Sequence, residues 1–76
     1  MSNNLWRVYR QNEFLGIFKL NTEDRALIVG NISAKKILIG DLLHLENIDT
    51  GESLTLYIKM RSSKIRNGYS YEKVTV

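Results

Sequence analysis

Few side chains of this sequence could carry out catalysis. It contains one histidine, His44, and no cysteine, which excludes cysteine nucleophiles, disulfides and thiolate zinc sites. His44 stands between leucines in an alternating pattern, where a lone histidine usually has a structural role. No Ser-His-Asp arrangement and no glycine-rich phosphate loop is present. Four nearby carboxylates could at most add oxygen ligands to a metal: Asp41, Glu46, Asp49 and Glu52. We therefore expect no enzymatic activity, no catalytic residues, no metal and no cofactor.

Basic and tyrosine residues gather near the C-terminus. Five of the 11 Lys and Arg residues, but one of the 8 acidic residues, fall within residues 59–76. Lysine and arginine neutralise phosphates and release counterions, and tyrosine rings offer faces on which bases can stack. This asymmetry favours a polyanionic partner. The sequence therefore predicts a nucleic-acid-binding surface made of Tyr57, Lys59, Arg61, Lys64, Arg66, Tyr69, Tyr71 and Lys73.

A hairpin is predicted to present these residues. Asn67-Gly68 is a strong signal for a two-residue type I′ turn, which needs positive φ at both central positions. With these residues in the turn, Arg66 faces Tyr69 and Lys64 faces Tyr71. The basic and tyrosine side chains of the ribbon then share one face. The competing interpretation is a solvated ribbon whose lysines only discourage edge-to-edge strand pairing.

The most regularly apolar stretch is Ile37 to Met60. It predicts two long strands joined by a tight turn at Asp49-Thr50-Gly51-Glu52. Gly40-Asp41 predicts a bend or bulge within the first of them. The second strand has the alternation that is typical of a half-buried strand. Its inward residues are expected to be Leu54, Leu56, Ile58 and Met60.

Further strands are predicted before this pair. Leu5–Arg10 is the first, with Trp6 and Val8 on one face and Arg7 and Tyr9 on the other. Phe14–Leu20 is the second, and both of its faces are apolar. A third follows over Arg25–Ile32, after the turn residues 21–24.

These elements predict an all-β fold in one domain that comprises residues 1–76. The expected architecture is a small SH3-like or OB-like barrel or sandwich of five to seven short antiparallel strands. The alternative is an α+β fold with one helix over 22–32 or 34–47, because Thr22 and Ser33 are both suitable N-caps. Gly40 would cost the second of these helices about 1 kcal/mol relative to alanine.

A second function class is compatible with the sequence. So short a chain has a thin core, and large apolar side chains near its N-terminus could remain on the surface. They are Trp6, Phe14, Leu15, Ile17 and Phe18. The alternative function is therefore a protein-interaction module, either an adaptor, assembly subunit or inhibitor, or a homodimer. No apolar run reaches the roughly 18 residues of a membrane span, and no signal peptide is evident, so we expect a cytoplasmic protein without membrane contact.

One segment resembles a known family. Asn31-Ile32-Ser33, with the basic residues that follow and Ile39–Leu45, is similar to the middle of PilZ domains, which bind a cyclic dinucleotide. However, Lys36 occupies the glycine position of that family's Asp/Asn-x-Ser-x-x-Gly motif. The family's Arg-x-x-x-Arg motif is missing, because Arg7 and Arg10 are one residue too close. We therefore transfer no ligand and no site residues from this resemblance.

Overall fold

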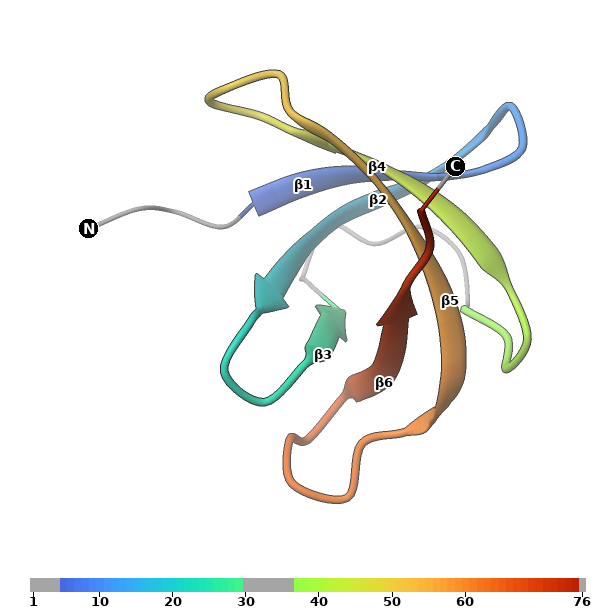
Figure 1. The fold of residues 1–76 in the computed structure, drawn as a ribbon, viewed down its shortest axis with the longest axis vertical. Coiled ribbons are helices and arrows are strands. Elements are labelled where there is room, and N and C mark those ends of the chain that lie inside the picture. The colour runs from blue at the N-terminus through green and yellow to red at the C-terminus, as the bar shows by residue number, and fades with distance from the viewer. Residues whose placement is uncertain (1–4, 30–36, 76) are drawn as a thin grey trace.

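Six strands form a closed barrel in the computed structural model, which describes residues 5–29 and 37–75 (Figure 1). The strands are β1 (Leu5–Arg10), β2 (Glu13–Asn21), β3 (Ala26–Val29), β4 (Leu42–Asn47), β5 (Ser53–Arg61) and β6 (Gly68–Lys73). Every neighbouring pair is antiparallel, and the order around the barrel is β1-β2-β3-β6-β5-β4. The prediction of a small all-β barrel is therefore confirmed.

The helical alternatives are wrong where the structure describes them. Residues 26–29 of the first proposed helix form β3, and residues 42–47 of the second form β4. The end of the predicted third strand and the start of the PilZ-like segment fall at 30–36, outside the described residues. Among the residues that the structure does describe, no helix is long and apolar enough to cross a membrane.

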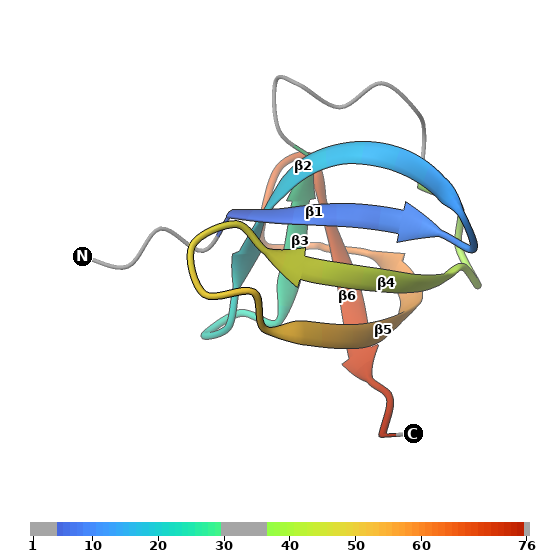
Figure 2. The same ribbon diagram turned by 90° about the horizontal axis from the view of Figure 1, so that it is seen from above.

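Alternating apolar residues fill the inside of the barrel. Trp6 and Val8 of β1 are both buried, which agrees with their predicted shared face, and so are Leu43 and Leu45 of β4 and Leu56 of β5. Figure 2 shows β1, β4 and β5 crossing β3 and β6 at a steep angle, so that the two groups of strands enclose this core.

A bulge in β2 places Phe14 outside the barrel. Val8 pairs with Gly16 and Tyr9 pairs with Phe14, so Leu15 has no partner on β1. Gly16 accommodates the bulge with φ of 136°. Leu15 is fully buried as a result, whereas Phe14 is 45% exposed. An extra residue in one strand thus explains why β2 carries apolar residues on both faces.

A second bulge in β5 makes one sequence prediction wrong. Ile58 pairs with Tyr71 and Met60 pairs with Ser70, so Lys59 has no direct partner on β6. The bulge reverses the alternation beyond Ile58. Met60 is therefore 58% exposed rather than part of the core.

The predicted long strand from Ile37 begins only at Leu42. Ahead of it, the Leu38 amide donates to Asp41 Oδ2 over 2.8 Å, and the Asp41 amide donates to the Leu38 carbonyl over 3.0 Å. These bonds form a turn in which Gly40 has φ of 92°. The prediction of a bend at Gly40-Asp41 is confirmed, but the segment before it is not strand.

Candidate nucleic-acid interface

The C-terminal hairpin differs from the predicted ribbon. β5 and β6 are joined by residues 62–67, and the last partners before this loop are Arg61 and Tyr69. The Ser62 hydroxyl accepts hydrogen bonds from the Lys64 amide at 3.2 Å and the Ile65 amide at 3.1 Å. These bonds curl the chain into a turn where a strand was expected. The predicted pairing of Lys64 with Tyr71 and of Arg66 with Tyr69 is therefore wrong.

The predicted residues consequently do not share one face. Tyr69 and Tyr71 are half-buried and pack against the core. Tyr57 and Lys59 of β5 are exposed on the outside of the barrel, and Arg61 is exposed at the end of the same strand. Lys64 and Arg66 are exposed on the loop, and Lys73 is exposed at the end of β6.

The predicted basic residues lie at two ends of β6. At its start, the Val29 amide donates to the Asn67 carbonyl over 3.0 Å, which fixes the loop beside the end of β3. Near its end, the Tyr71 amide donates to the Arg25 carbonyl over 3.4 Å, beside the start of β3. Six residues of strand span roughly 16 Å. Figure 2 shows the end of β6 and the turn between β2 and β3 on the same side of the barrel.

A basic pocket of about 390 Å³ lies at this second end. Three of the predicted residues line it, namely Lys59, Tyr71 and Lys73, together with Thr22, Arg25 and Glu72. Three cations thus surround one concave site that contains a single carboxylate. We call these six residues the basic pocket. Thr22 and Arg25 were not predicted as site residues, because only the pairing of β3 with β6 brings the β2–β3 turn to the C-terminal hairpin.

The charges of the basic pocket are only weakly compensated. Lys59 Nζ lies 3.9 Å from Glu72 Oε2, and the side chains are 51% and 67% exposed. An exposed ion pair of this kind contributes roughly 0–1 kcal/mol, so an incoming anion can compete for the lysine. Burial raises the pKa of the Tyr71 hydroxyl, and the charge of Arg25 acts against that rise. The hydroxyl is therefore neutral at physiological pH and can donate a hydrogen bond.

Next to the pocket, the outside of β4 and β5 carries exposed apolar side chains. Tyr57 pairs with Leu42 on one side and with Glu72 on the other. The turn before β4 adjoins the same place, because the Gly40 amide donates to the Ile58 carbonyl over 2.8 Å. We call these exposed residues the outer apolar patch: Leu38, Ile39, Leu42, Tyr57 and Met60.

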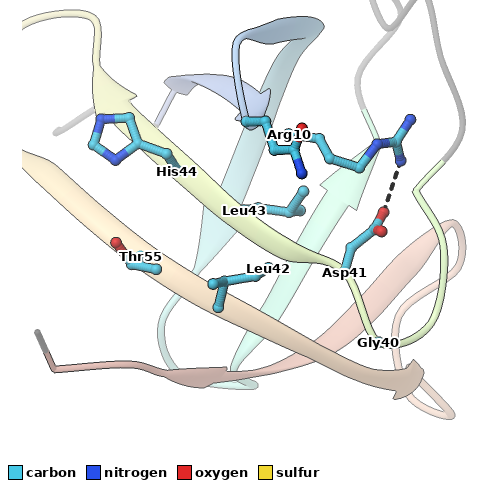
Figure 3. Close-up of a pocket in the computed structure, with 8 residues that line it drawn as sticks. Arg10, Gly40, Asp41, Leu42, Leu43, His44 and Thr55 are labelled. Carbon is cyan, nitrogen blue, oxygen red and sulfur yellow. Dashed lines mark hydrogen bonds and ion pairs between the residues drawn. The ribbon is translucent and has the colours of Figure 1, made fainter.

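Another pocket, also of about 390 Å³, lies where β1 and β4 meet (Figure 3). Arg10 Nη1 donates to Asp41 Oδ2 over 2.8 Å, and this bond raises the pKa of Arg10. His44 and Thr55 line the pocket from neighbouring strands. In the described part of the chain, no group of three His, Asp or Glu side chains could hold a metal ion. The Arg10–Asp41 pair instead ties the turn before β4 to the end of β1.

Comparison of the chain with protein-family models, with curated proteins and with solved structures finds no match.

Proposed function

We propose that this chain is a non-enzymatic nucleic-acid-binding protein. The observation that carries the proposal is the basic pocket, in which Arg25, Lys59 and Lys73 converge from three separate elements. Phosphate oxygens accept hydrogen bonds and carry negative charge, so cations and hydroxyl donors around one concavity suit them. Arg25, Lys59 and Lys73 contact phosphate, and the hydroxyls of Thr22 and Tyr71 donate to it.

The other predicted residues have secondary roles in this proposal. Tyr57 stands beside the pocket and offers a ring face for stacking. Arg61, Lys64 and Arg66 supply positive charge at the opposite end of β6, where they attract a polyanion over a longer range. Tyr69 contributes mainly to packing, since it lies against the core.

A salt-titrated binding assay with two charge-matched variants tests the proposal. Lys59→Gln/Lys73→Gln removes two charges at the pocket, whereas Lys64→Gln/Arg66→Gln removes two at the loop. We expect the first variant to weaken binding to labelled DNA or RNA about tenfold more than the second, because direct phosphate contacts are lost. Equal effects of the two variants would refute the pocket as the site. Absence of binding at low salt would refute the function.

A protein-interaction module is the second candidate. The predicted N-terminal surface is wrong in part, because Trp6, Leu15 and Phe18 are buried in the core. The outer apolar patch favours this candidate instead. Leu42 is 56% exposed and Met60 is 58% exposed, and a group of exposed apolar side chains of this kind is typical of a protein-interaction surface. Light scattering across a range of concentrations, compared between the wild type and Leu42→Ser/Met60→Ser, tests for self-association through the patch. A monomer at every concentration would leave only a different protein as partner, to be sought by pull-down.

A further inference from the structure

We infer that the ligand is single-stranded nucleic acid, with one backbone phosphate in the basic pocket and an adjacent base stacked on Tyr57. This inference rests on the proposed function and makes it more specific. It places a base on Tyr57 beside the phosphate and distinguishes between single strands and duplexes.

Tyr57 and the basic pocket are close enough for one nucleotide to contact both. Tyr57 is the direct cross-strand partner of Glu72, which lines the pocket. Side chains of such partners have Cβ atoms about 5 Å apart. Lys59, which also lines the pocket, follows Tyr57 by two positions on the same strand. A base and its own phosphate have a comparable separation, so stacking and phosphate binding are compatible.

The surroundings of Tyr57 favour an unpaired base. Its side chain is 43% exposed, and its partner on β4 is the exposed Leu42. Apolar and aromatic groups of this kind bind the faces of bases, and in a duplex these faces are already covered by neighbouring base pairs. Ring exposure on a sheet surface therefore selects for single strands.

The architecture also disfavours recognition in a duplex groove. A major groove admits an α-helix or a projecting two-stranded ribbon. Through residues 5–29 and 37–75 there is no helix, and β5 and β6 are both built into the closed barrel. The ribbon that the sequence predicted would have been such a projection, but the curled loop after Ser62 replaces it.

The charge of Glu72 provides a second test for a phosphate in the pocket. Among the described residues it is the only carboxylate that lines the pocket, and its Oε2 lies 3.9 Å from Lys59 Nζ. Its negative charge opposes an incoming phosphate and competes for the lysine. Glu72→Gln should therefore strengthen binding, by roughly threefold for an exposed charge. Glu52→Gln removes the same charge from the exposed β4–β5 turn and is the matched control.

Fluorescence anisotropy with a single-stranded oligonucleotide of about 12 nucleotides and a duplex of equal length tests the inference. We expect the single strand to bind at least about tenfold more tightly. Tyr57→Ser should weaken single-strand binding about tenfold, whereas Tyr57→Phe, which keeps the ring, should preserve it.

Arg25→Gln should make the negative slope of log K against log salt shallower by about 0.7, the value for one phosphate of a single strand. Arg7→Gln, on the outside of β1, should leave it unchanged.

The outcomes separate this inference from the proposed function. If the duplex binds as tightly as the single strand, or if Tyr57→Ser binds like the wild type, the inference is wrong while nucleic-acid binding stands. If Arg25→Gln and Arg7→Gln change the salt slope equally, the phosphate is not in the pocket. If neither probe binds at low salt, both the inference and the proposed function fail.

Discussion

At the scale of single residues, Tyr71 links stability to pH. Burial raises the pKa of its hydroxyl above the ordinary value of 10.0. The folded protein therefore keeps this proton to a higher pH than the unfolded chain does. The stability that this contributes is complete below the ordinary pKa and is lost as pH rises through it toward the folded value.

Replacement of Tyr71 tests this linkage. The free energy of unfolding in urea should fall in the wild type as the pH rises through 10.0 and above, and that of Tyr71→Phe should fall less because phenylalanine has no proton to lose. Tyr57→Phe is the matched control, since it removes the hydroxyl of an exposed tyrosine. A Tyr71→Phe profile parallel to that of the wild type would contradict the assignment.

Asn47 has a different residue-scale role, as the buried polar group that shapes the β4–β5 turn. Its Oδ1 accepts hydrogen bonds from the Asp49 amide at 2.8 Å and the Thr50 amide at 2.9 Å. Asn47→Ala leaves both amides without this acceptor and should lower the free energy of unfolding by about 2 kcal/mol. Asn47→Asp keeps an acceptor and should lose less. Chemical denaturation of the two variants measures the difference, and equal losses would show that the hydrogen bonds are not responsible.

At the scale of elements, the same turn depends on a backbone conformation. Gly51 has φ of 76°, and an added Cβ would meet no atom within 4 Å. The cost of Gly51→Ala is therefore conformational and should be about 1 kcal/mol. Gly51→Asn should recover part of it, because asparagine tolerates the left-handed region. Thermal unfolding of both variants checks whether Gly51→Asn is the more stable. If steric crowding caused the loss, the larger asparagine would instead make Gly51→Asn the less stable of the two.

Elements governed by local patterns were predictable from the sequence. Leu5–Arg10 forms β1 with the predicted bounds, and its alternation placed Trp6 and Val8 on the same face, which is the buried one. The alternation after Ser53 likewise identified β5, up to its bulge at Lys59. Bulges are not visible in such patterns, because the extra residue is defined by the partner strand.

The C-terminal hairpin and the basic pocket were not predictable in the same way. Asn67-Gly68 is a strong local signal, and Asn67 does adopt φ of 59°. The Ser62 side chain and the pairing of Gly68 with Ile28 on β3 override the two-residue turn. Arg25 is distant in sequence from Lys59 and Lys73, and only barrel closure brings them together. The site is therefore a property of the topology.

At the scale of the whole molecule, charge is distributed unevenly around a barrel with net charge +3. In the pocket between β1 and β4, the charge of Arg10 is neutralised by Asp41 (Figure 3). The described lining of the basic pocket instead contains three cations and one carboxylate. Net charge this small gives little non-specific attraction. Binding should therefore weaken steeply with salt only while the basic pocket is intact, and the salt titrations described above measure this.

The pairing of β3 with β6 has a consequence for the dynamics of the barrel. Within the described residues these strands share three register partners, against five between β4 and β5: Ala26 with Ser70, Leu27 with Tyr69 and Ile28 with Gly68. One backbone hydrogen bond on each side extends the pairing, from Val29 to Asn67 and from Tyr71 to Arg25. Arg25 lies on one side of this short seam, and Lys59 and Lys73 lie on the other. Local opening of a barrel should begin where the fewest hydrogen bonds hold it, so the amides of the seam should exchange with solvent sooner than those between β4 and β5. A phosphate held between Arg25 and the two lysines would bridge the seam, and hydrogen–deuterium exchange would then slow there first. A bound nucleic acid would therefore stabilise the pairing of β3 with β6 against local opening.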